Sequence, residues 1–165
     1  MTAGLVVVLV LAAILAVFLS LLAVQPATAD TIHPGEVITG NVVWSAAGND
    51  HVVTGSISIA VGSSLTIEPG CTVKFDAGTG LTVGGTLNAS GTVGQPILMT
   101  RRDAGEAWTG LAFSAASHGT LAYCTIEYAS YYGGAAAVRG DGYWPAVEHC
   151  TIRNNSYGAL LSGIT

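Results

Sequence analysis

The fold class is decided by the stretch LTIEPGCTVKFDAGTGLTVGGTLNASGTVGQPILMTRRDAGEAWTGLAF, residues 65–113. It consists of short alternating or apolar runs, each closed by glycine, proline or asparagine. Apolar residues recur with a period of two, and the helical spacing i, i+3, i+4, i+7 is absent. A period of two places alternate side chains on one face of a β-strand. The stretch therefore predicts short strands joined by turns.

The same pattern continues on both sides of this stretch. Upstream, Ile57 and Ile59 alternate to face one side, and Gly62 supplies a turn. Downstream, YCTIEY at 123–128 is answered by HCTIRN at 149–154, so that Cys150 repeats Cys124. A repeat of this size indicates a solenoid, in which each unit buries its apolar face by stacking on its neighbours.

A family resemblance rests on residues 52–97, followed by WTGLAF, GTLAYCTIEYA and EHCTIRNNSYGALL. These runs resemble the right-handed parallel β-helix repeats of bacterial and archaeal secreted proteins in the pectin-lyase-like superfamily. The resemblance covers roughly residues 40–165 and implies an all-β, right-handed parallel β-helix. It implies little about activity, because that superfamily includes polysaccharide lyases, glycoside hydrolases, adhesins and surface proteins.

Aligning the two copies in such a fold predicts how neighbouring coils stack. The inward face should hold Cys124, Ile126 and Tyr128. Glu127 and Arg153 should be outward neighbours about 4.8 Å apart along the stack, forming an exposed cross-coil ion pair.

The segment 1–29 differs in kind from the rest of the chain. Residues 4–24 contain no charge, and Ala27-Thr28-Ala29 before Asp30 is typical of a signal-peptide cleavage site. The apolar run is long and lacks a preceding Lys or Arg, so a retained membrane anchor is the alternative. We expect a signal or anchor helix over 1–29, a capping region over 30–50, and β-helix repeats over 51–165 that continue beyond this sequence.

Charge and cysteine content narrow the function classes. All formal charges follow residue 29, so residues 30–165 carry 5 − 10 = −5. Nucleic acid is not an expected partner, because phosphate binding needs clustered Lys and Arg. Cys71, Cys124 and Cys150 fit no zinc motif, but a Cys124–Cys150 disulfide can form if the geometry allows.

Catalytic residues are not predicted. Lyases of the superfamily gather acidic calcium ligands beside a basic residue, and the candidates here, Lys74, Asp76 and Arg153, are accompanied only by scattered carboxylates. The hydrolase pattern of paired aspartates is absent. His118 and His149 are interpreted as turn or surface residues. We therefore expect no cofactor, with calcium reserved for the lyase alternative.

Aromatic residues in predicted loops are the main candidates for binding. They are Tyr131, Tyr132, Tyr143, Trp144 and Trp108. Exposed rings stack on sugars and often mark binding surfaces, although loop rings can also fold down over coil edges. The sequence thus favours a secreted or cell-surface scaffold for adhesion or carbohydrate binding, with cell-envelope polysaccharide as partner. The alternative is a polysaccharide lyase or glycoside hydrolase whose catalytic coils lie beyond residue 165.

Overall fold

The computed structural model describes residues 29–47, 49–130 and 136–162. The predicted signal or anchor helix therefore lies outside the described residues, apart from Ala29, which is exposed together with Asp30 just before the first strand. Within the described ranges, no helix is long and apolar enough to cross a membrane.

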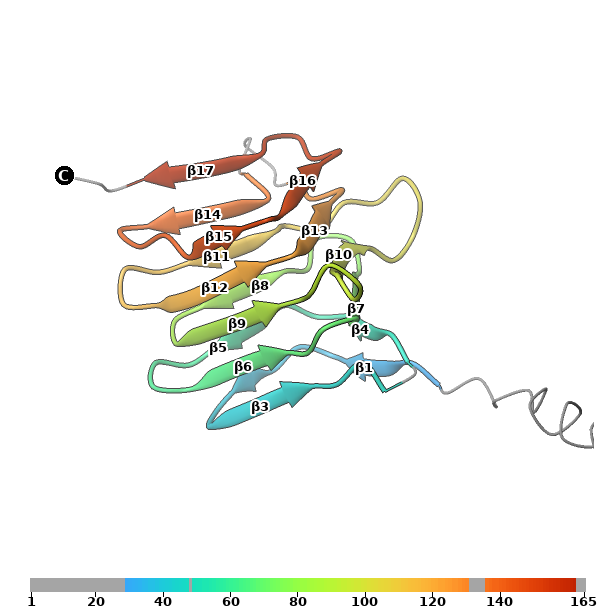
Figure 1. Cartoon of the computed structure of the whole chain (residues 1–165), viewed down its shortest axis with the longest axis horizontal. Helices are drawn as coiled ribbons and strands as arrows, with labels where there is room; N and C mark the ends of the chain where they lie inside the picture. Colours follow the sequence, from blue (N-terminus) through green and yellow to red (C-terminus); the bar gives the residue numbers. More distant parts are fainter. Residues whose placement is uncertain (1–28, 48, 131–135, 163–165) are drawn as a thin grey trace, which may run out of the picture.

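The described chain is built from short β-strands, as the period of two predicts (Figure 1). In chain order they are β1 (Thr31–His33), β2 (Val37–Ile38), β3 (Asn41–Trp44), β4 (His51–Val53), β5 (Ile57–Ile59), β6 (Ser64–Ile67), β7 (Thr72–Phe75), β8 (Leu81–Val83), β9 (Thr86–Ser90), β10 (Ile97–Arg101), β11 (Leu111–Phe113), β12 (His118–Ala122), β13 (Cys124–Glu127), β14 (Val138–Asp141), β15 (Ala146–Glu148), β16 (Thr151–Arg153) and β17 (Ala159–Ser162).

Every third strand belongs to the same parallel sheet, so the chain winds as a β-solenoid with three strands per turn. Sheet A has the order β1-β4-β7-β10-β13-β16. Sheet B has the order β2-β5-β8-β11-β14-β17, and sheet C the order β3-β6-β9-β12-β15. Figure 1 shows the coils stacked along one axis, with β1 and β3 at one end and β17 at the other. The predicted parallel solenoid is confirmed.

The register between coils explains the sequence repeat. In sheet A, Val73 pairs with Met99, Met99 with Ile126, and Ile126 with Ile152. These partners follow one another along the chain at a nearly constant interval, so each coil places an apolar side chain directly over the equivalent one below. Residues 31–44, which lie within the expected capping region 30–50, form a coil of the same kind, since β1, β2 and β3 pair with β4, β5 and β6.

The core is the inside of the solenoid, where alternate residues of all three sheets meet. Its largest fully buried side chains include Trp108, Phe75, Phe113, Leu65 and Leu87. About 25 cal/mol is gained for each Å² of apolar surface removed from water, so this continuous stack stabilises the coils. Ile57 and Ile59 are both buried, which confirms the expectation that their side chains lie on the same face of the strand.

One predicted core position is wrong. Tyr128 does not continue the inward alternation of Cys124 and Ile126, because the strand ends at Glu127 and Tyr128 takes a left-handed backbone with φ 59°. Its ring lies under the Arg101 guanidinium, 4.0 Å from the ring centroid. A left-handed residue turns the chain out of the strand, so its side chain leaves the core.

Candidate functional site

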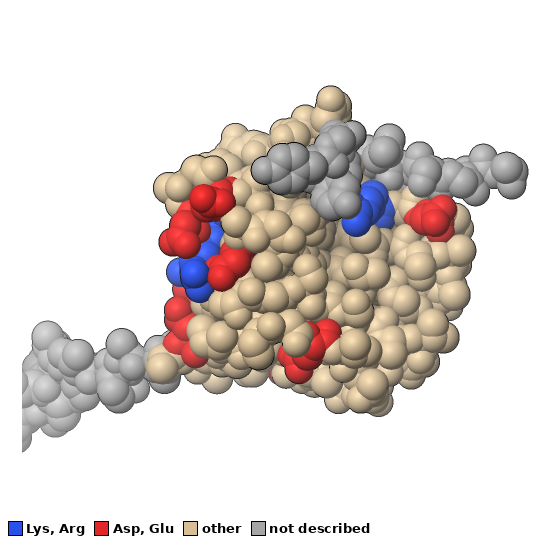
Figure 2. Space-filling view, turned by 180° about the vertical axis from the view of Figure 1, so that it is seen from behind, with Lys and Arg blue, Asp and Glu red and all other residues tan. Residues whose placement is uncertain are grey.

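The charged residues lie mainly beside sheet A. Ion pairs join Lys74 to Asp50, Arg102 to Asp76 at 2.9 Å, and Arg102 to Asp103 at 3.4 Å. Figure 2 shows many of the acidic and basic side chains along one edge of the visible face and a few others scattered over its otherwise uncharged surface. In the described ranges, no three His, Cys, Asp or Glu side chains converge as a metal site would require.

A different edge, the corner between sheets C and A, brings aromatic rings together. Tyr123 connects β12 to β13, and His149 follows β15 one coil later. Both have left-handed backbones, with φ 49° and 52°, so a single residue turns the corner and its side chain points away from the core. The two rings stack with centroids 4.7 Å apart and planes inclined by 16°.

A groove lies against this ring stack, and we call it the corner groove. Its volume is about 370 Å³, and its lining residues are Thr92, Val93, Pro96, Tyr123, Cys124, Thr125, His149 and Thr151. The loop that carries Thr92, Val93 and Pro96 follows β9 at the same corner and replaces the single-residue turn of the later coils. Val93 is 83% exposed, so its apolar side chain is open to a ligand in the groove.

The chemistry of the corner groove is neutral. Threonine hydroxyls offer both donors and acceptors, the Tyr123 and His149 rings offer flat faces, and Val93 and Pro96 add apolar surface. Such a mixture suits a ligand with hydroxyl groups around its edge and C–H groups on its face. Among the described residues, no Asp, Glu, Lys or Arg lines the groove.

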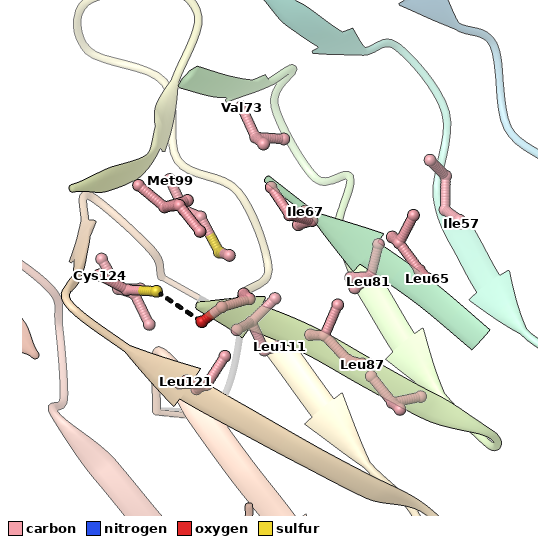
Figure 3. Packing of buried hydrophobic residues seen from close by; sticks show 14 of the residues in the cluster. Ile57, Leu65, Ile67, Val73, Leu81, Leu87, Met99, Leu111, Leu121 and Cys124 are labelled. Atoms are coloured by element: carbon pink, nitrogen blue, oxygen red, sulfur yellow. Dashed lines mark hydrogen bonds between the residues drawn. The ribbon is translucent and has the colours of Figure 1, made fainter. Parts of the chain in front are cut away.

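Two thiols lie at this corner, and one of them, Cys124, lines the groove. Cys124 and Cys150 are free, and both side chains point to backbone carbonyls of sheet C one coil earlier. The Cys124 thiol donates to the Ala89 oxygen at 3.3 Å, the bond drawn in Figure 3, and the Cys150 thiol donates to the Leu121 oxygen at 3.2 Å. The disulfide that the sequence permits is therefore replaced here by two equivalent hydrogen bonds in successive coils.

Cys71, two coils before Cys124, makes the same kind of hydrogen bond to a sheet C carbonyl. Its thiol donates to the Trp44 oxygen at 3.3 Å, and Trp44 lies in the column that continues through Ile67 and Ala89. Each cysteine at this corner thus donates to a sheet C carbonyl of the preceding coil.

The thiols differ in acidity. The neighbouring Cys124 thiol lowers the pKa of the half-buried Cys150 below the ordinary thiol value. The same contact, together with burial, raises the pKa of Cys124 above the ordinary thiol value. Burial also raises the pKa of Cys71. Cys150 is consequently the thiol most ready to lose its proton.

The predicted aromatic cluster does not form as a unit in the described residues. Trp108 is a core residue with 0% exposure, so the expectation of an exposed binding ring is wrong at this position. Its ring stacks on Phe75 with centroids 4.1 Å apart, and its indole N–H donates to the Glu127 oxygen at 2.8 Å. Tyr131 and Tyr132 lie outside the described residues.

Tyr143 and Trp144 fold against the core instead of standing free. Both are half-buried, and the Tyr143 hydroxyl accepts a hydrogen bond from the Gly119 N–H at 3.1 Å. Tyr143 also contacts the edge of His118, with centroids 5.4 Å apart. These rings therefore cover coil edges, which is the alternative that the sequence left open for loop aromatics.

A second hollow lies on sheet B. It has a volume of about 280 Å³ and is lined by Thr82, Ala112, Phe113, Ser114, Arg139, Gly140 and Asp141. It combines one cation and one carboxylate with an apolar floor, so it differs in character from the corner groove. The sequence did not predict either hollow. The ring residues Tyr123 and His149, at equivalent positions of the repeat, were the one feature that could have indicated the corner groove.

Comparisons with known proteins identified no related protein. A scan against protein-family models gave no match, a search of curated proteins gave none, and a search of solved structures gave none.

Proposed function

We propose that this protein is a non-catalytic scaffold at the cell surface or outside the cell, which binds a neutral polysaccharide at the corner groove. The observation that carries the proposal is the stack of Tyr123 and His149 beside three threonine hydroxyls, in a groove whose described lining holds no charged side chain. Aromatic faces pack against the C–H faces of sugars, while hydroxyls exchange hydrogen bonds with sugar hydroxyls.

The outward face of sheet C supports the same proposal. Its strands end at the groove, and Asn41, Ser64 and Thr86 form one outward column while Thr66, Asn88 and Thr120 form the next. These neutral side chains repeat at the strand spacing of about 4.8 Å. A linear glycan held at the groove could continue along this regular polar surface.

The proposed setting comes from the sequence. The Ala27-Thr28-Ala29 pattern and the long apolar segment favour export, either as a cleaved secreted protein or as an anchored one. The right-handed winding of pectin-lyase-like proteins is proposed for the solenoid on the resemblance and on the general preference for right-handed crossovers. N-terminal sequencing of the exported protein would test cleavage, since a mature chain should begin at Asp30.

The binding test uses the full chain purified in mild detergent and a panel of neutral and acidic polysaccharides. Retention on a neutral glycan should be lost in Tyr123→Ala and weakened in His149→Ala. Tyr157→Ala is the matched control, because Tyr157 is 59% exposed but lies away from the groove lining. Unchanged retention in Tyr123→Ala would contradict the site. Release of reducing or unsaturated sugar ends, with or without calcium, would contradict a non-catalytic role.

A further inference from the structure

Three buried aromatic rings pack together where the first coil of the solenoid meets the second. His33 ends β1, Trp44 ends β3 and His51 begins β4. Trp44 stacks on His33 with centroids 4.3 Å apart and on His51 with centroids 5.0 Å apart. Exposure is 8% for His33, 3% for Trp44 and 5% for His51, so both imidazoles are removed from water.

The two imidazoles belong to one continuous chain of hydrogen bonds. His33 Nδ1 lies 3.1 Å from Glu36 Oε1, and His33 Nε2 lies 3.1 Å from His51 Nδ1. At the far end, His51 Nε2 lies 3.1 Å from the Ser45 carbonyl oxygen. The chain thus begins at a carboxylate and ends at a carbonyl, which are both acceptors.

These two ends fix the number of protons between them. His33 Nδ1 must carry a proton for the Glu36 carboxylate, and His51 Nε2 must carry one for the Ser45 oxygen. The link between the rings needs one more. Three N–H groups on two imidazoles amount to one positive charge, whereas two neutral rings carry only two N–H groups. A fourth proton would place two N–H groups against each other across the 3.1 Å link.

The charged groups around the pair are consistent with a single positive charge. Glu36 contacts it from the turn after β1. Asp50 precedes His51 but is paired with Lys74 of β7, and Asp30 precedes β1 near the same lysine. From the next coil, the Glu68 N–H and the Cys71 thiol both donate to the Trp44 oxygen behind the rings.

Burial acts against further protonation. It lowers the pKa of His51 below its ordinary value, and the neighbouring His33 lowers it further. An unfolded chain takes up a proton at each imidazole as the pH falls through about 6.5, whereas the folded pair keeps its single extra proton and takes up no second one. Below about 6.5 the unfolded chain binds more protons than the pair and stability declines; above it the unfolded chain binds fewer, so stability is greatest near that pH.

We propose that His33 and His51 form a one-proton latch that holds the first coil closed near neutral pH and releases it on acidification. In the described chain, each strand of this coil pairs on one side only: β1 with β4, β2 with β5 and β3 with β6. Release would leave the later coils intact and would uncover the edges of β4, β5 and β6. This latch is independent of the proposed glycan site.

Hydrogen exchange of the full chain, read by mass spectrometry between about pH 7.5 and 5, tests the release. After correction for intrinsic rates, exchange in residues 31–44 should accelerate by up to about tenfold per pH unit below about 6.5, the limit for one proton. Peptides from β10 and β11 should not change. His51→Gln should remove the pH dependence, and His118→Gln, at an exposed histidine of sheet C, should retain it.

A second measurement needs no variant. Long-range proton–nitrogen spectra of the wild-type imidazoles at about pH 7 should show three protonated ring nitrogens shared by His33 and His51. Two neutral rings, or first-coil exchange that follows the later coils at every pH, would overturn the latch.

Discussion

Arg153 reaches across one coil of the solenoid to Glu127, with 2.8 Å between Nε and Oε2. Sequence alignment of the two repeats predicted this pair, and it is confirmed, but its two sides differ. The Arg153 side chain is 58% exposed and the Glu127 side chain only 10% exposed. The other Glu127 oxygen accepts a hydrogen bond from the Thr100 hydroxyl at 3.2 Å. Glu127 therefore ties three consecutive coils of sheet A together.

This asymmetry predicts unequal effects of mutation. Glu127→Ala should lower the free energy of unfolding by about 1–3 kcal/mol, because it removes one buried and one part-buried hydrogen bond. Arg153→Ala should cost less than about 1 kcal/mol, since water can replace the exposed guanidinium. Urea unfolding followed by circular dichroism measures both. Equal losses in the two variants would show that Glu127 does not have the central role.

Trp108 should behave as a core residue and not as a ligand-binding ring. Trp108→Ala should cost about 3–5 kcal/mol through the cavity left beside Phe75. Trp108→Phe keeps a ring for stacking but leaves the Glu127 carbonyl without its indole donor, so it should cost about 1–2 kcal/mol. Thermal melts give the ranking. A stable Trp108→Ala protein that had lost glycan binding would contradict this assignment.

Gly110 and Gly78 both have a left-handed backbone, and substitution by alanine should destabilise the protein more at Gly110. Gly110 has φ 82°, and a Cβ there would lie 2.6 Å from the Ala137 oxygen of the next coil. Gly78 has φ 72° with no atom near its Cβ position within 4 Å, so Gly78→Ala is the matched control. The control should cost about 1–2 kcal/mol of backbone strain. Gly110→Ala should cost a further ~1–3 kcal/mol by overpacking, and equal melting temperatures would refute the close approach.

Cys150 should be the first thiol to react. Its pKa is lowered below the ordinary thiol value, so its alkylation should begin at a lower pH than that of the other two thiols. Cys71 and Cys124 should react more slowly, because burial contributes to raising the pKa of each. Peptide mass spectrometry after brief iodoacetamide treatment across a pH series distinguishes them, with Cys150→Ser as the control. Earlier labelling of Cys71 would contradict this order.

The repeat at 123–128 and 149–154 was enough to predict the parallel solenoid and the placement of Glu127 beside Arg153, because both depend on local alternation and on a constant coil length. The inward placement of Tyr128 failed, since alternation alone does not reveal where a left-handed residue ends the strand. Trp108 was misplaced for a related reason: its loop position is local, but its burial depends on Phe75 in the preceding coil.

The sequence pattern could not predict sites that are formed by loops of unequal length. The corner groove exists because residues 91–96 form a long corner, whereas later coils turn there with Tyr123 alone or with His149 and Cys150. The latch depends on a first coil that is shorter than the later ones, since Thr31 pairs with His51 whereas Thr125 pairs with Thr151. That shorter coil brings His33 beside His51, and neither histidine lies in the sequence repeat.

The residue-by-residue register between coils has an evolutionary consequence. Each coil contacts its two neighbours and meets no closure requirement, in contrast to a barrel, whose strand number is fixed by its circumference. A tandem duplication of one coil from sheet A to sheet A would thus insert a unit whose upper and lower surfaces already match. The length of such a protein can grow by genetic slippage in steps of one whole coil, while its side surfaces and corner chemistry are copied with it.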